Sequence, residues 1–288
     1  MIYPANFEEK IGFDRIREQV TALCSTPSAK AKLAEEGFST SADEIERRLS
    51  LMNEMRSLLM LERDFPDGDY PDPAPLVAKI RVEGSYLLAA EADQLRKALV
   101  TVGAIAEFIL GRGGAHYPRL WEVSRRVTLF PEIVRAIDAI LDDRGEVKDS
   151  ASPELQQVRR AIREREGQAA KRLQQVLQRA KQAGIVDADA VLSVRDGRPV
   201  IPVAAANKRK LQGFIHDESA TGRTFYVEPV EVVEINNELK ELEYAERREV
   251  VKVLSAFTES IRLDAEAIAD AGDYLSSVDM IRAKARWA

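Results

Sequence analysis

Three consecutive basic residues, Lys208-Arg209-Lys210, are the strongest candidates for chemistry in this chain of 288 residues. Arg195 and Arg198 lie shortly before them, and Arg223 follows. Lysine and arginine side chains neutralise backbone phosphates and release counterions, so such a group binds nucleic acid without reading its base sequence. The alternative is a solvated surface loop.

Two further interpretations of this stretch are weaker. Arg223 could equally pair with Asp217 or Glu218. His216 lies next to Asp217 and close to Ser219, a grouping that suggests a hydrolytic nucleophile. Neighbours on one strand point to alternate faces, however, so they rarely assemble a catalytic triad.

Other catalytic and metal-binding patterns do not occur in the sequence. The single cysteine, Cys24, cannot form an internal disulfide and favours a reducing compartment. The two histidines, His116 and His216, lack zinc-ligand spacing, and no glycine-rich phosphate loop is present. We therefore expect this chain to need no cofactor of its own and to be catalytically silent.

The charge is unevenly distributed. The net charge is −6, yet residues 153–211 contain 13 Lys/Arg against 6 Asp/Glu, a net of +7 that leaves −13 for the rest. Such a basic sector steers polyanions toward it. Aromatic residues make up only 6% of the chain and charged residues 31%, which favours a helix-rich soluble protein over a β-sandwich or barrel.

A helical arm is predicted after Ser152-Pro153, a cap followed by a first-turn proline. A second long helix is predicted after Pro229. The two helices should pack as an antiparallel pair, with residues 185–229 connecting them at one end. The first helix has a heptad-like apolar seam of Leu155, Val158, Ile162, Ala169, Leu173, Val176 and Ala180.

Most basic residues of this arm have a structural interpretation. Eight Lys/Arg between 159 and 181 face seven glutamates between 231 and 249, and complementary charge fixes the register of an antiparallel pair. We therefore favour residues 195–223 over the arm for phosphate contact.

The segment between the two predicted long helices contains short β-like runs. Residues 190–194 and 199–203 flank Asp196-Gly197, a hairpin signal, and residues 213–216 and 224–227 form a second pair. Pro199 and Pro202 should keep their strand at an edge or a bulge. A small antiparallel sheet therefore caps the arm.

The rest of the chain predicts a helical core. An amphipathic helix is expected over the first 25 residues, one after the Ser41 cap, one over 89–110 and one over 131–141, with a loop at 65–75. The fold class is thus mainly α: a helical core (1–150 and 255–288), an outgoing helix (151–184), a β-rich tip (185–229) and a return helix (230–254).

The tip carries a recognisable motif. Residues 213–229, GFIHDESATGRTFYVEP, followed by Asn236-Asn237, resemble a signature of the MutS-like ATPases, and are most similar to their second bacterial branch. Residues 13–17, 149–155 and 283–288 resemble that branch at corresponding places. The resemblance implies an N-terminal fragment with the helical lever and the clamp, without the ATPase domain and without the nuclease domain that many members carry.

The resemblance also implies partners and context. The full-length protein would use ATP and Mg, form a homodimer and act in the bacterial cytoplasm. The fragment would bind the phosphate backbone of duplex or branched DNA, and this binding would serve to suppress recombination. One alternative is a clamp on ribosomal RNA that rescues collided ribosomes. Another, of a different class, is a coiled-coil arm whose tip docks a protein.

Overall fold

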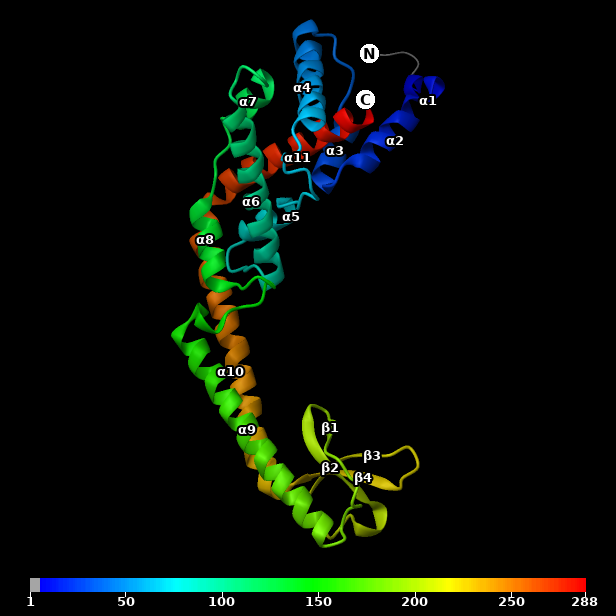
Figure 1. Ribbon diagram of the computed structural model, residues 1–288, viewed down its shortest axis with the longest axis vertical. Helices are drawn as coiled ribbons and strands as arrows, with labels where there is room; N and C mark the ends of the chain where they lie inside the picture. The colour runs from blue at the N-terminus through cyan, green and yellow to red at the C-terminus, as the bar shows by residue number, and fades with distance from the viewer. Residues whose placement is uncertain (1–5) are drawn as a thin grey trace. The chain divides into compact units, whose positions relative to one another are not determined.

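The computed structural model describes residues 6–288, which form two compact units (Figure 1). Unit 1 is built from the chain up to Lys148 and from Val253 onward, and unit 2 comprises Asp149–Lys252. Helices dominate, and one small four-stranded antiparallel sheet lies in unit 2. The predicted fold class, mainly α with a long helix pair and a small sheet, is confirmed.

Unit 1 is mainly helical in its described part. Ser41 caps one of its long helices as predicted, because its hydroxyl accepts a hydrogen bond from the backbone N–H of Glu44. The helices are α1 (Phe7–Ile11), α2 (Phe13–Leu23), α3 (Pro27–Glu35), α4 (Ala42–Leu61), α5 (Ala74–Ile80), α6 (Ala89–Arg112), α7 (Pro118–Ser124), α8 (Pro131–Ile140), α11 (Ala265–Trp287) and the end of α10 (Val230–Ser260).

The single helix expected over the first 25 residues is wrong for the described part of that segment. Gly12 lies in the left-handed region, with φ of 74°, and separates α1 from α2. A glycine in this conformation ends a helix because it carries no Cβ to clash with the backbone. Residues 1–5 of that expectation lie outside the described residues.

Helix α11 is the element around which unit 1 packs, since it contacts α2, α3, α4, α5 and α6. It contains a buried ion pair: Arg282 is 1% exposed and donates to the Oδ1 of Asp279 at 2.8 Å. Arg282 also donates to the carbonyl of Gly68 and stacks over the ring of Tyr70. Asp279 accepts from the backbone and hydroxyl of Thr26. One ion pair therefore joins three distant segments.

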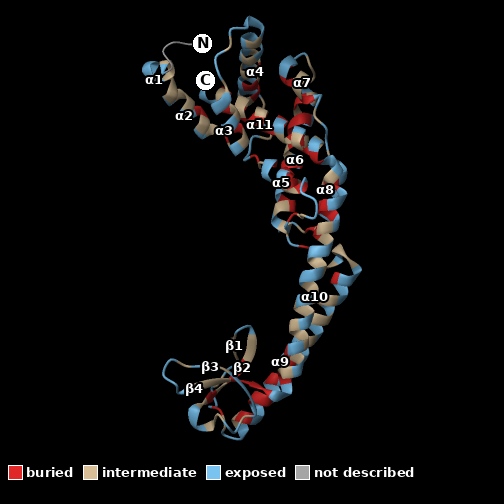
Figure 2. Ribbon diagram, turned by 180° about the vertical axis from the view of Figure 1, so that it is seen from behind, coloured by how far each residue is buried: buried red, intermediate tan, exposed pale blue. Residues whose placement is uncertain are grey.

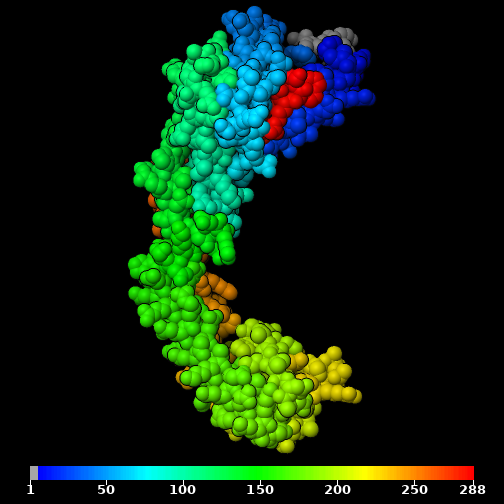
Figure 3. All heavy atoms as spheres, viewed as in Figure 1, coloured from blue at the N-terminus to red at the C-terminus, as the bar shows by residue number. Residues whose placement is uncertain are grey.

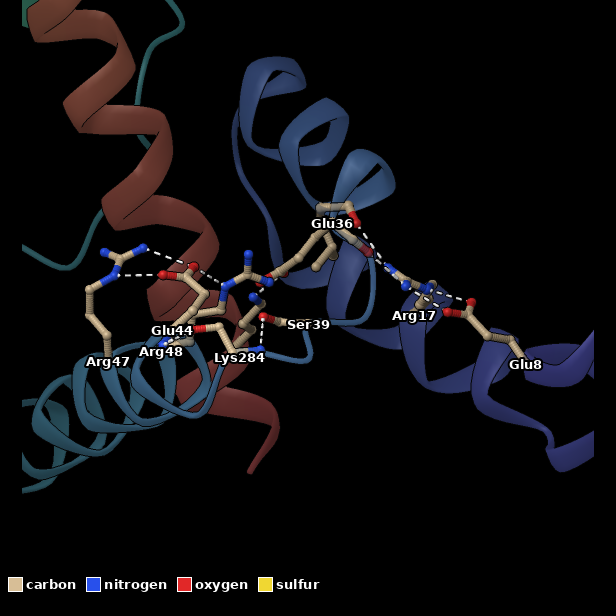
Figure 4. Close-up of polar contacts among 10 residues, drawn as sticks. Glu8, Arg17, Glu36, Ser39, Glu44, Arg47, Arg48 and Lys284 are labelled. Carbon is tan, nitrogen blue, oxygen red and sulfur yellow. Dashed lines mark hydrogen bonds and ion pairs between the residues drawn. The ribbon is translucent and has the colours of Figure 1, made fainter. Parts of the chain in front are cut away.

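A second polar network lies at the surface of unit 1 (Figure 4). Glu36, just after α3, accepts from Arg48 of α4 and from Lys284 of α11. Arg17 of α2 donates to the backbone carbonyl of Glu36 and to the carboxylate of Glu8. The loop after α3 is thereby tied to three helices.

Unit 2 contains the predicted helix pair, α9 (Pro153–Gln182) and most of α10. Ser152 caps α9, because its hydroxyl accepts from the N–H of Leu155 at 3.0 Å. Of the predicted seam, Val158 and Ile162 are half-buried, and Leu177 is an additional buried residue. The remaining seam residues are buried as expected: Leu155, Ala169, Leu173, Val176 and Ala180.

The sheet of unit 2 has the strand order β1-β2-β4-β3, all antiparallel. Both predicted hairpins form, and at the β1–β2 turn Asp196 and Gly197 both have positive φ, which suits a tight hairpin. The strands are β1 (Ser193–Arg195), β2 (Arg198–Ala204), β3 (Gly213–Glu218) and β4 (Thr224–Pro229).

We expected Pro199 and Pro202 to keep their strand at an edge or at a bulge, yet β2 lies between β1 and β4 in the strand order. The register gives the reason. β1 pairs with residues 198–200, and β4 pairs with residues 201–204. Each part of β2 is thus paired on one side only, which leaves an open side for a residue without an N–H.

One face of the sheet packs on the end of α9 (Figure 2). Ile201, Val203 and Val227 are fully buried and belong to one cluster with Leu173 and Val176 of α9. A small sheet needs such a helix to bury its apolar face, since isolated hairpins are marginally stable. The tip and the adjoining end of the arm therefore fold as one body.

We predict that Arg282→Ala destabilises unit 1 by about 3–5 kcal/mol, because it leaves the buried carboxylate of Asp279 unpaired. Arg286→Ala is the matched control: Arg286 bonds Asp67 from the same helix, but its side chain is 38% exposed, so the loss should be at most about 1 kcal/mol. Urea unfolding followed by tryptophan fluorescence isolates unit 1, since Trp121 and Trp287 both lie there. Equal losses for both variants would contradict the prediction.

Candidate nucleic-acid interface

The basic run Lys208–Lys210 lies in the loop that connects β2 to β3. A short 3-10 turn, Ala205–Asn207, precedes it. The side-chain amide of Asn207 donates to the carbonyl of Ile185 at 3.0 Å, which anchors the loop to the chain just after α9. The loop is therefore fixed at its start.

The structure brings Arg223 beside this loop. The backbone N–H of Ala205 donates to the carbonyl of Arg223 at 2.9 Å, so the β3–β4 hairpin meets the turn after β2. Lys208 places its Nζ 4.3 Å from the ring centroid of Phe225, a cation–π contact at the same end of the sheet. We call Lys208, Arg209, Lys210 and Arg223 the basic corner.

The basic corner is open to solvent. Arg209, Lys210 and Arg223 are exposed, and Lys208 is half-buried. Within residues 6–288, none of the four side chains forms an ion pair. The pairing of Arg223 with Asp217 or Glu218, left open from sequence, is not formed. Unpaired exposed cations can neutralise phosphates, which releases the counterions condensed on the nucleic acid.

The other two predicted residues, Arg195 and Arg198, form ion pairs within the sheet. Arg195 donates its Nε to Asp217 at 2.8 Å and stacks 3.7 Å above the ring of Tyr226. Arg198 donates its Nη1 to both carboxylate oxygens of Glu228, at 2.9 and 3.0 Å. The structure therefore separates these two arginines from the basic corner and gives each a carboxylate partner.

Glu228 is a buried carboxylate that sequence reasoning missed. Its side chain is 1% exposed and accepts from His216, Arg198 and Asn236. Burial raises the pKa of Glu228, but the hydrogen bonds from these three side chains and the charge of Arg198 outweigh burial, so the net pKa is lowered. The available signal was a glutamate between the apolar residues Val227 and Pro229.

The asparagine pair after β4 completes this cluster. Asn236 donates to Glu228 at 2.6 Å, and Asn237 accepts from Arg198 at 3.0 Å. Both partners are side chains, which fasten the sheet to the first turns of α10.

The residues of the hydrolytic interpretation have different partners. His216 bonds Glu228, and Asp217 bonds Arg195. The hydroxyl of Ser219 accepts from the backbone N–H of Thr224, at 3.1 Å, inside the hairpin loop. These side chains stabilise the sheet and do not form a triad with one another. Over residues 6–288 no group of three His, Cys, Asp or Glu side chains could hold a metal ion.

Ion pairs across the helix pair account for several arm arginines, as predicted. Arg159 bonds Glu246 at 2.7 Å, Arg165 bonds Glu238 at 2.7 Å, and Arg179 approaches Glu231 at 3.7 Å. As the residue number of the arginine rises along α9, the residue number of its glutamate partner falls along α10, as expected for antiparallel helices. Complementary charge therefore connects these two helices.

The geometry defines a helical body and an antiparallel helix pair that ends in a small sheet with a basic corner. No family model matches the chain. Three curated relatives align over 278 residues, which is 96% of this chain and 35% of each relative. They are endonuclease MutS2 of Geobacillus sp. (strain WCH70), 30% identical, endonuclease MutS2 of Thermomicrobium roseum, 31% identical, and the putative endonuclease MutS2 of Bacillus subtilis (strain 168), 29% identical.

The chain is homologous to the N-terminal portion of endonuclease MutS2 proteins. This confirms the resemblance drawn from residues 213–229. The chain spans about a third of the length of these relatives. No helix in the described part of the chain is long and apolar enough to cross a membrane.

We predict that Gly213→Ala destabilises the tip by about 1–3 kcal/mol through overpacking. A Cβ at Gly213 would lie 2.2 Å from the carbonyl oxygen of Glu228, which is backbone and cannot move aside. Gly167→Ala in α9 is the control, since no atom lies within 4 Å of its added Cβ, and helix propensity favours alanine there by about 1 kcal/mol. Amide hydrogen exchange of β3 and β4 should rise in the first variant alone.

Acid should weaken the tip through Glu228. Because its folded pKa is lowered, its contribution is complete above the ordinary value of 4.5 and is lost as pH falls through the folded pKa. Glu228→Gln should cost about 2–3 kcal/mol at neutral pH and flatten the acid dependence of exchange in β2 and β4. Asp217→Asn, at a 47% exposed carboxylate, should cost less than about 1 kcal/mol. An unchanged acid profile in Glu228→Gln would contradict this assignment.

Proposed function

We propose that unit 2 is a nucleic-acid clamp whose basic corner contacts backbone phosphates. One observation carries the proposal: Lys208, Arg209, Lys210 and Arg223 have no carboxylate partner, whereas the other two arginines of the sheet are paired. Paired cations are already neutralised by their carboxylates, whereas an unpaired cation can neutralise a phosphate and release the counterions condensed on the nucleic acid. Homology to endonuclease MutS2 proteins supports a nucleic-acid partner.

The contact should be independent of base sequence. Two of the four cations are lysines, which bind phosphate as point charges. All four lie in the loop before β3 or at the β3–β4 hairpin, and none is on a helix that could enter a major groove. Backbone contact of this kind positions a protein on nucleic acid without selecting a site.

In the full-length protein we propose that this chain supplies the clamp and the lever of a MutS2 ATPase on branched DNA, in suppression of recombination. Phosphate contacts serve DNA and ribosomal RNA alike, so a clamp on collided ribosomes would use the same four residues. The comparison of duplex DNA with structured RNA therefore belongs in the binding experiment.

Replacing Lys208, Arg209 and Lys210 together by alanine should weaken binding to duplexes of all sequences alike. Each lost phosphate contact reduces the slope of log affinity against log salt by about 0.9, so the slope should flatten by up to roughly 3. Fluorescence anisotropy over a salt series, started at low salt, measures both quantities.

The matched control removes three other basic residues, Arg160, Lys171 and Arg172, which are exposed on α9. This variant loses the same formal charge but should keep most of the salt slope, because its residues lie outside the basic corner. If both triple variants flatten the slope equally, the arm as a whole binds. An unaltered slope in the first variant overturns the clamp proposal and favours a tip that docks protein.

A further inference from the structure

One aromatic ring of the tip, that of Phe214 in β3, is exposed and unpartnered. The tip contains three aromatic residues. Lys208 lies over the ring of Phe225 at 4.3 Å, and Arg195 lies over the ring of Tyr226 at 3.7 Å. These two rings are half-buried. Phe214 is 59% exposed and contacts no ring and no cation among the residues that the structure describes. Its aromatic face is therefore available to a ligand.

The backbone that carries this ring is firmly held. The carbonyl of Gln212, just before β3, accepts from the N–H of Val230 at 3.2 Å, and Phe214 itself pairs with Glu228 of β4. A phenylalanine on a fixed strand has only two side-chain torsions to order, so a contact with its ring costs little entropy. In the space-filling view the β3–β4 hairpin, drawn in yellow, projects from the body of the tip, which leaves the strand accessible (Figure 3).

The exposed ring follows closely on the basic corner. Lys210 and Phe214 are four residues apart in the sequence, so their Cα atoms can be separated by at most about 14 Å. Beyond Phe214 the charge of the strand changes sign, because β3 ends in Asp217 and Glu218. A polyanion is therefore attracted to the Lys210 side of the ring and repelled from the far end of β3.

Unpaired cations beside a free aromatic ring are the combination that binds single-stranded nucleic acid. The cations hold the phosphates, and the ring stacks on a base, which any base permits because each has an aromatic face. In a duplex the bases are already paired and stacked on one another, and taking one out of the stack costs a few kcal/mol. The ring can therefore distinguish unpaired bases from a continuous duplex, which the cations alone cannot do.

On the basis of the function proposed above for the basic corner, we propose that Phe214 is a stacking platform for an unpaired base, with Arg209 and Lys210 on the adjoining phosphates. The preferred ligand is then a nucleic acid with a single-stranded segment, such as an overhang or a junction. Stacking releases no counterions, so this part of the affinity should not depend on salt.

Two probes test this assignment by fluorescence anisotropy at low salt: a labelled oligothymidylate and a blunt duplex of the same length. Phe214→Ala should weaken binding of the oligothymidylate at least about fivefold, with an unchanged salt slope, and should leave binding of the duplex unaltered. Phe214→Leu keeps an apolar side chain but has no aromatic face, so it should lose as much as Phe214→Ala. Phe214→Trp should bind the oligothymidylate at least as tightly as the wild type.

Ile215→Ala is the matched control, since Ile215 is the next residue of the same strand, is 51% exposed and is aliphatic. It should change the affinity for neither probe. Amide hydrogen exchange of β4 establishes that each variant is folded.

Three results overturn the stacking proposal. They are an unchanged oligothymidylate affinity in Phe214→Ala, which leaves the ring to a protein ligand, a wild-type affinity in Phe214→Leu, and equal losses on both probes. Failure of the clamp proposal has a different signature, namely an unaltered salt slope when Lys208, Arg209 and Lys210 are replaced together. Wild-type protein that binds neither probe at low salt refutes both proposals.

Discussion

The buried pair of Arg282 and Asp279 is the interaction on which unit 1 depends. Unit 1 is made from two stretches of chain separated by the whole of unit 2, so its last helix must find the segments near Thr26 and Gly68 across more than two hundred residues. Desolvating two charges is costly, and that cost is offset where α11 brings the pair against the hydrogen-bonding groups of Thr26 and Gly68.

Unit 2 uses the same device on a smaller scale. Glu228 joins β2, β3 and the first turns of α10 through Arg198, His216 and Asn236. In both units an arginine–carboxylate pair lies where separate elements meet, and apolar packing surrounds it. The cations of the tip therefore fall into two groups. Arg195 and Arg198 are paired and stabilise the sheet, whereas the cations of the basic corner form no ion pair with described residues.

The sequence was sufficient to predict the helix pair, both hairpins and the arm ion pairs, because these follow from local periodicity, turn residues and charge order. It was insufficient for Glu228, whose three partners come from three elements and have no common spacing. It also misplaced β2, since β2–β4 pairing joins two hairpins that are separate in sequence. For the candidate site, all six cations could be named from the sequence. Only the fold distinguishes Arg223, which lies beside the loop, from Arg195 and Arg198, which are paired within the sheet.

The split pairing of β2 makes one side chain responsible for joining the two parts of the sheet. β1 pairs only with residues 198–200 and β4 only with residues 201–204, so the backbone ladder changes partner between Val200 and Ile201. Arg195 of β1 crosses this step, because it pairs with Asp217 of β3 and stacks over the ring of Tyr226 of β4. Opening of the β1–β2 hairpin therefore requires the loss of these two contacts, whereas the β2–β4–β3 ladder is held by its own packing on α9.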